Sequence, residues 1–127
     1  MYKIDNQSRI AVYEQIINQV EKYVIAGILI AGDKMPSVRK LSVELNVNPN
    51  TVQRAYTELE RSGVITTSPK RGAFVSDSGA TELRSIKKEQ SMKKLRIVLT
   101  DLKLSDVSKK QILDIVKEIF DGGEQDD

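Results

Sequence analysis

Residues 35–65 read MPSVRKLSVELNVNPNTVQRAYTELERSGVI, and they predict two short helices joined by a tight turn. Ser37 is a good N-cap for a short helix that should end near Asn46. A second helix should begin after Asn48, because asparagine caps well and the proline that follows is favoured at the first helical position. Gly63 should close it, and a turn of roughly three or four residues separates the two helices. The apolar positions that share one face are Val38, Leu41 and Leu45 in the first helix and Val52, Ala55, Tyr56 and Leu59 in the second.

The neighbouring segments extend this pair into a larger unit. An amphipathic helix is expected from about Val12 to Val24, and a connector with a minimal strand near Lys34–Met35 follows it. After the pair, two β-prone runs, 64–67 and 73–76, flank the segment SPKRG and predict a hairpin with a basic tip. Helix, helix, turn, helix and hairpin in this order are typical of a winged helix-turn-helix.

The rest of the chain predicts two further helices. The first carries one apolar seam from Met92 to Leu102. The second is announced by Ser108 and Gln111, which are spaced as a capping box. Gly122–Gly123 should stop this last helix, before a short acidic tail that is expected to be disordered.

A small polar stretch, 77–81, is interpreted as a hinge or domain boundary. It divides the chain into a winged helix-turn-helix DNA-binding domain, 1–77, and a helical dimerisation segment with an acidic tail, 78–127. The expected fold class is therefore mainly α with a small β-hairpin, in which a short two-helix C-terminal segment follows the winged domain.

Composition excludes several classes of protein. The chain has no cysteine and no histidine, which excludes disulfides, zinc fingers and histidine-dependent triads, and neither a metal nor a cofactor is expected. Charged residues make up 30% of the chain and interrupt every apolar run, and no signal-peptide pattern is present, so we expect a cytoplasmic protein without membrane contact. No phosphate loop or dinucleotide fingerprint occurs, which makes an enzyme the least favoured class.

Basic charge is concentrated in the helix-turn-helix and the hairpin. Between residues 34 and 75, seven basic side chains face three acidic ones, whereas the last ten residues carry five acids and no base. The major groove of B-DNA admits one helix, which reads bases with hydrogen-bonding side chains of its first turns. The side chains that meet this need are Asn50, Thr51, Gln53 and Arg54. On the hairpin, Lys70 and Arg71 should reach the flanking backbone or minor groove, and Gly72 should allow a close approach.

The same residues carry a resemblance. The run quoted above, with RGAFV at 71–75, resembles the GntR family of bacterial transcription regulators, and specifically its small YtrA-type branch. The resemblance is close over 13–75 and extends in outline to the C-terminal segment. The DNA contacts that it implies come from Arg39, Asn48, Asn50, Thr51, Gln53, Arg71 and Gly72, and Ser37 of the same PSVR motif joins the candidates. Pro49 and Gln53 depart from many relatives, so no operator sequence is carried over.

The C-terminal helices offer apolar faces that a second copy of the chain would cover, since about fifty residues are too few to enclose a drug-sized pocket. A two-fold dimer would present two recognition helices to half-sites about 10 base pairs, or a multiple of that, apart. The candidate dimerisation residues are Met92, Leu95, Val98, Leu99, Leu102, Ile112, Ile115, Val116, Ile119 and Phe120. Alternatively, the seam of the first of these helices folds back on its own winged domain.

We therefore predict a homodimeric regulator that binds double-stranded operator DNA in a sequence-specific manner and represses an operon. The family resemblance implies a transport-related target. A protein-interaction adaptor that uses the winged helix without reading DNA is the alternative. The sequence identifies no small-molecule effector.

Overall fold

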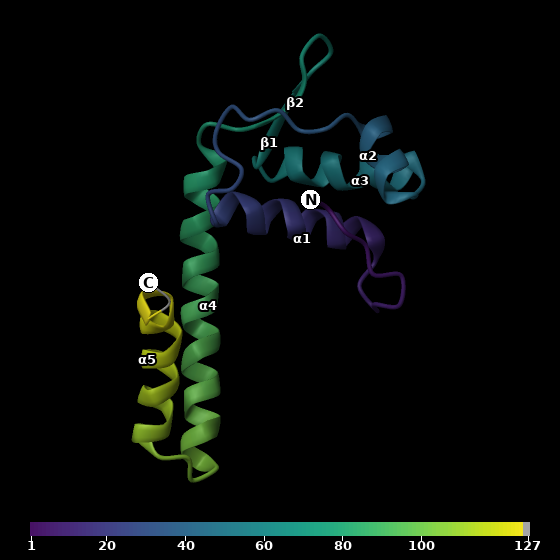
Figure 1. Cartoon of the computed structure of the whole chain (residues 1–127). Coiled ribbons are helices and arrows are strands. Elements are labelled where there is room, and N and C mark those ends of the chain that lie inside the picture. The colour runs from purple at the N-terminus through teal and green to yellow at the C-terminus, as the bar shows by residue number, and fades with distance from the viewer. Residues whose placement is uncertain (126–127) are drawn as a thin grey trace. The chain divides into compact units, whose positions relative to one another are not determined.

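Helices dominate the computed structural model, which describes residues 1–125. The elements along the chain are α1 (Val12–Ile25), α2 (Val38–Leu45), α3 (Pro49–Arg61), β1 (Ile65–Ser68), β2 (Gly72–Val75), α4 (Gly79–Leu104) and α5 (Lys109–Gln125) (Figure 1). They form two compact units, Met1–Lys87 and Lys88–Asp127. Three helices and a two-stranded hairpin in the first unit confirm the predicted fold class.

The core of the first unit lies where α1 packs against α3 (Figure 1). The side chains that face it recur at helical spacing, so each helix is apolar on one side only. The fully buried members are Ile16, Val20 and Val24 of α1, Leu41 of α2, and Val52, Ala55 and Leu59 of α3. These are the faces that the periodicity of the sequence predicts.

The turn between α2 and α3 is fixed by local hydrogen bonds. The Ser37 hydroxyl accepts from the Lys40 amide at 3.0 Å and caps α2, and Asn46 ends that helix in the left-handed region at φ 54°. The Asn48 side chain then accepts from the Asn50 amide at 2.8 Å, with proline at the first helical position. Both predicted N-caps and the end of α2 at Asn46 are confirmed.

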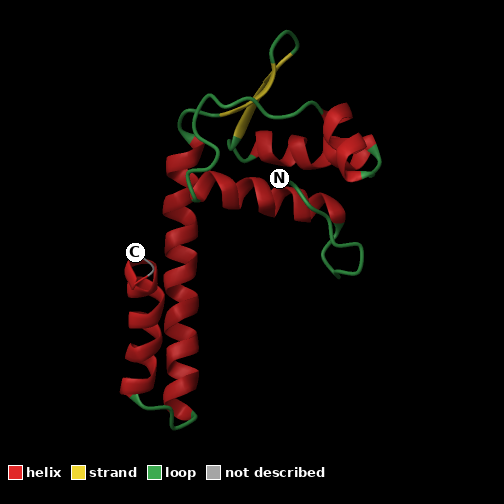
Figure 2. Ribbon diagram, viewed as in Figure 1, coloured by secondary structure: helices red, strands yellow, loops and turns green. Residues whose placement is uncertain are grey.

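The hairpin is antiparallel, with Ile65 opposite Val75 and Ser68 opposite Gly72 (Figure 2). The connector before α2 lies along the other side of β2. Its Gly32 amide donates to the Val75 carbonyl at 2.9 Å, and Lys34 forms a β-bridge with Phe74. The minimal strand that the sequence predicts near Lys34 is therefore present as this bridge.

The first five residues run along α1 and are held by side chains one helical turn apart. The Gln19 side chain accepts from the Lys3 amide at 2.8 Å, and the Gln15 side chain accepts from the Asp5 amide at 2.9 Å. The Tyr23 hydroxyl donates to the Met1 carbonyl at 2.6 Å. Because the backbone of this segment is bonded to α1, the Tyr2 side chain is placed against the core.

The interpretation of 77–81 as a hinge is wrong, because α4 begins inside this stretch, at Gly79, and runs as one helix to Leu104. Ala80 and Leu83 in its first turns are buried in the core of the first unit. That unit consequently extends to Lys87, beyond residue 77. Polar composition alone misled the prediction, since the small residues here serve close packing rather than flexibility.

The prediction that Gly122–Gly123 stops the last helix is also wrong, because α5 continues to Gln125. A glycine inside a helix weakens the helix without ending it. Glu124 of the expected disordered tail is thus helical, whereas residues 126–127 lie outside the described residues.

The start of α5 agrees with the sequence. The Ser108 hydroxyl accepts from the Gln111 amide at 3.1 Å, while the Gln111 side chain accepts from the Ser108 amide at 2.9 Å, so the capping box is formed. No helix within residues 1–125 is long and apolar enough to cross a bilayer.

Candidate nucleic-acid interface

The first turns of α3 present polar side chains away from the core. Asn50 and Gln53 are exposed, and Thr51 is half-buried. Two predicted contacts, Ser37 and Asn48, use their side-chain oxygens as helix caps. They therefore fix the positions of α2 and α3, whatever further contacts they make.

Gln53 does not stand alone on this face. Its Nε2 atom donates to the Thr57 hydroxyl one turn further along α3, at 3.2 Å. Thr57 is exposed as well. Thr57 is not among the DNA contacts predicted from the sequence, although glutamine and threonine at i and i+4 on a helix are close enough to pair.

Arg54 has a partner outside α3. Its guanidinium lies over the ring of Tyr13 on α1, with Cζ 3.8 Å from the ring centroid. A cation over an aromatic face gains about 0.5–1 kcal/mol at an exposed site. Arg54 is thus directed towards α1, and the periodicity of α1, which assigns Tyr13 to the apolar face, gave no sign of this contact.

The wing carries the basic residues at its tip. Lys70 and Arg71 are exposed between the paired ends of the two strands, and Gly72 has φ +82°, a conformation that side chains rarely adopt. Arg39 is exposed on the first turn of α2. The predicted basic positions are therefore open to solvent.

Side chains of α3 hold its surroundings in place. The Glu60 carboxylate accepts from the Thr67 hydroxyl of β1 at 2.8 Å, which ties the wing to the recognition helix. The Tyr56 hydroxyl donates to the Pro36 carbonyl at 2.7 Å, next to the start of α2. Burial raises the pKa of Tyr56 well above its usual range. An open hollow of about 410 Å³ lies between these elements and includes Gln53 in its lining.

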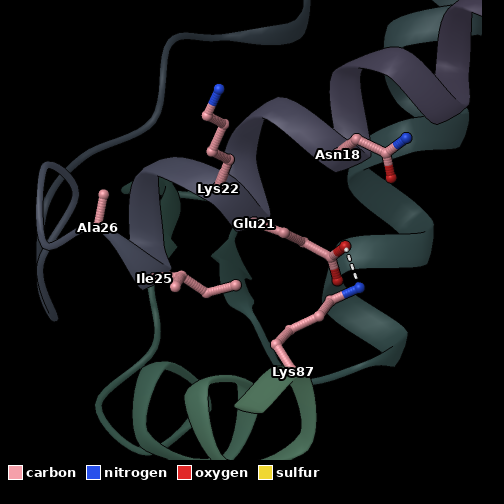
Figure 3. A pocket seen from close by; sticks show the side chains of 6 residues that line it. All are labelled: Asn18, Glu21, Lys22, Ile25, Ala26 and Lys87. Atoms are coloured by element: carbon pink, nitrogen blue, oxygen red, sulfur yellow. Dashed lines mark ion pairs between the residues drawn. The ribbon is translucent and has the colours of Figure 1, made fainter. Parts of the chain in front are cut away.

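A second hollow lies at the carboxyl end of α1 (Figure 3). The Lys87 ammonium lies 3.6 Å from the Glu21 carboxylate across it, and Ile25 and Ala26 form its apolar side. Next to it, the Arg84 guanidinium donates to the carbonyls of Val24 and Ile25 at 3.2 Å. This cation satisfies the last carbonyls of α1 and favours the negative end of its dipole.

In the second unit, α5 runs antiparallel to the preceding part of α4 (Figure 2). Leu99, Leu102 and Ile112 are half-buried at this contact, and Leu99 and Ile112 line one hollow together. The other predicted dimerisation residues are exposed, with Met92 48%, Leu95 46%, Val98 52%, Ile115 54%, Val116 43%, Ile119 71% and Phe120 79% exposed. Among the described residues of the second unit, the two helices thus leave most of these apolar side chains uncovered.

Comparison with known proteins identifies the family. A model of "Bacterial regulatory proteins, gntR family" matches residues 12–75. The chain belongs to the GntR family. This match covers α1 to β2 and so confirms the resemblance predicted from the helix-turn-helix and wing. As a member, this GntR protein is a DNA-binding regulator of transcription rather than an enzyme.

The similarity of this GntR protein to some relatives extends over its full length. It is 38% identical to the HTH-type transcriptional repressor YtrA of Bacillus subtilis, with all of both chains covered. The structure of a transcriptional regulator from Oenococcus oeni superposes with a TM-score of 0.75 and 32% identity, over 92% of this chain and 97% of that one. YtrA of Sulfolobus acidocaldarius, a GntR-family transcription factor, gives a TM-score of 0.58 and 33% identity, over 72% and 96%. These matches confirm the predicted resemblance to the YtrA-type branch.

Proposed function

We propose that this GntR protein is a homodimeric, sequence-specific repressor that binds a two-fold symmetric operator. The observation that carries the proposal is the exposed polar start of α3, with Asn50 and Gln53, in the same unit as a wing whose tip carries Lys70 and Arg71. The amino end of α3 adds free amides and a partial positive charge that favour a phosphate. Bases are read by the helix, and the wing binds the flanking backbone.

A second copy of the chain is the partner that we assign to the second unit. Both helices of this unit carry exposed apolar side chains, among them Ile119 and Phe120 of α5. Full burial of one large apolar side chain contributes about 1.5–3 kcal/mol, so covering several of them outweighs the cost of association. Two helical hairpins related by a two-fold axis would form a four-helix arrangement that covers both faces at once.

The regulatory outcome that we propose is repression. Support comes from the relative in Bacillus subtilis, a protein similar over its whole length whose name describes a repressor. A dimer bound across a promoter would exclude other proteins from it. The transport-related operon rests on the family resemblance, and a regulator of chromosomal promoters works in the cytoplasm. The proposal includes no small-molecule effector.

The first experiment is a binding selection with genomic fragments at physiological salt, followed by sequencing of the retained fragments. An enriched motif with two-fold symmetry and half-sites about 10 base pairs, or a multiple, apart is expected. Retention without any motif would leave a non-specific basic surface and would favour the adaptor. The affinity should also fall with a log–log salt slope of about −0.9 for each phosphate contacted.

Two classes of variant separate base reading from backbone binding. Gln53→Ala and Asn50→Ala should each cost about 1–3 kcal/mol at the operator and relax the preference for one base pair. Lys70→Ala should weaken binding to all sequences alike and reduce the salt slope by about 1. If Gln53→Ala weakened random DNA as much as operator DNA, residue 53 would not read a base.

Sedimentation at micromolar concentration tests the dimer. A dimer is expected, and a single change at the most exposed of the candidate dimerisation residues, Phe120→Glu, should shift it to monomer, because a charge would be buried without a partner. Lys117→Glu, on the same helix outside the apolar positions, is the matched control and should leave the dimer intact. A wild-type monomer would reject the dimer and favour the alternative in which the seam folds back on its own winged domain.

A further inference from the structure

The side-chain amide of Gln53 is oriented by its neighbour. Its Nε2 atom donates to the Thr57 hydroxyl at 3.2 Å, and both residues are exposed on α3. The buried face of the helix, which includes Val52 and Ala55, lies elsewhere. The pair therefore stands on the surface that base reading requires, and the contact removes rotational freedom from the amide before any DNA is bound.

The chemistry of the amide limits which base it fits. A carboxamide has two N–H donors and one acceptor oxygen. With one N–H given to Thr57, a single N–H and Oε1 remain for a ligand. An adenine offers an N7 acceptor beside an N6 amino donor in the major groove, and this pattern matches that remaining pair. A guanine offers two acceptors, N7 and O6, so Oε1 of Gln53 would face another acceptor.

The residue on this helix that would suit guanine is engaged elsewhere. Arginine reads guanine by two parallel hydrogen bonds. Arg54, next to Gln53 in the chain, holds its guanidinium 3.8 Å from the Tyr13 ring centroid. The first turns of α3 thus present the oriented amide of Gln53, whereas the Arg54 guanidinium is stacked on α1.

We propose that Thr57 is a positioning residue that takes the N–H pointing away from Oε1 and so sets Gln53 to read the adenine of an A·T pair. The inference rests on the proposed function, in which α3 enters the major groove. To the proposed function it adds the base that Gln53 contacts, adenine, and the residue that orients the Gln53 amide, Thr57.

The test begins with the full-length wild-type chain and the operator found by selection. Binding is measured to operators that carry each of the four bases at every position of a half-site, for the wild type and for Gln53→Ala. One position should prefer adenine by about 5- to 150-fold, and this preference should vanish in Gln53→Ala while the other positions keep theirs.

Thr57 is then changed in two ways. Thr57→Val preserves the shape of the side chain but removes the acceptor, and the adenine preference should fall about 2- to 10-fold, the equivalent of one hydrogen bond. Thr57→Ser keeps a hydroxyl and should retain most of the preference. Thr81→Val is the matched control, since it makes the same change at an exposed position in the first turn of α4, and it should leave the preference unchanged.

The outcomes are distinguishable. If the base preference that Gln53→Ala loses is not for adenine, or if Thr57→Val keeps the full adenine preference, the inference about Thr57 is overturned and the proposed function stands. A Thr57→Val protein that only melts at a lower temperature, with its base preference intact, would make the pair a helix-stabilising contact and would overturn the inference too. If the wild type selects no motif at all, the proposed function fails, and this inference fails with it.

Discussion

Gly79 allows the start of α4 to be tested with a single added methyl group. A Cβ at Gly79 would lie 2.9 Å from the carbonyl carbon of Gly63 and closer still to the Gly63 oxygen and the Ser76 hydroxyl. Backbone atoms cannot rotate away as the end of a long side chain can. The Gly79 amide also donates to Ser76 at 3.0 Å, and Ser76 donates to the Gly63 carbonyl. Gly79→Ala must therefore displace the helix and disturb both hydrogen bonds.

The expected loss follows from these contacts. Overpacking costs about 1–3 kcal/mol, and loss of the hydrogen bond from the Gly79 amide costs about 1 kcal/mol. The better helix propensity of alanine offsets about 0.5–1 kcal/mol of this. We expect Gly79→Ala to lower the free energy of unfolding of the first unit by about 2 kcal/mol. With a urea m-value of about 1–3 kcal/mol/M, the midpoint should fall by roughly 1 M.

Tyrosine fluorescence is a suitable probe, because the four tyrosines of the chain, residues 2, 13, 23 and 56, lie in the first unit. Gly122→Ala is the matched control, since a Cβ added to that glycine would meet no atom within 4 Å beyond its chain neighbours and the adjacent backbone of α5. It should leave the tyrosine transition unchanged and raise the stability of α5, followed by circular dichroism, by about 0.5–1 kcal/mol. A Gly79→Ala protein as stable as the wild type would refute the packing argument and restore the hinge at 77–81.

Other side chains of the first unit supply further tests. Tyr56→Phe removes the hydrogen bond to Pro36 and should lower stability by about 1 kcal/mol, whereas Tyr2→Phe should raise it by up to about 1 kcal/mol, because the buried Tyr2 hydroxyl has no partner among residues 1–125. Burial raises the pKa of both hydroxyls, to about 12 for Tyr2. The free energy of unfolding should therefore be fully present below about pH 10 and fall as the pH rises towards 12, less steeply in each variant than in the wild type. Equal pH slopes of the unfolding free energy in wild type and variants would contradict this. Arg84→Met removes two hydrogen bonds to the end of α1 and should cost about 1 kcal/mol in thermal melts; an unchanged melting temperature would show that α1 needs no such cap.

Local signals predicted the first unit well because they act over a few residues. Ser37 and Asn48 cap helices through amides two or three positions away, so their types and spacing suffice to place α2 and α3. The basic tip of the wing is likewise legible from its flanking strands. In such places the residue type decides the backbone conformation without help from the rest of the fold.

The sequence could not predict what depends on distant partners. Position 79 requires a glycine because α4 starts against the backbone of Gly63, where a side chain would not fit. From composition alone, the same glycine predicted a hinge. Arg54 is exposed on α3, yet its orientation follows from Tyr13, which is 41 residues earlier in the chain. The type of a surface residue determines what its side chain can bind, whereas the helix packed beside it determines the orientation of that side chain.

These partners bear on the role that the proposed function gives to α3, the reading of bases. Tyr56 bonds to the chain before α2, Glu60 bonds to the wing, and Arg54 stacks on α1, so the helix is held to three neighbouring elements. Asn50 stays exposed, and the Gln53 amide, held by Thr57, keeps Oε1 and one N–H for a ligand. Discrimination of about 1–3 kcal/mol for each base pair is lost when a reading group is misplaced by roughly 0.5–1 Å. A helix held in this way loses little backbone entropy on binding DNA. More of the free energy of each base contact is then left to distinguish one sequence from another.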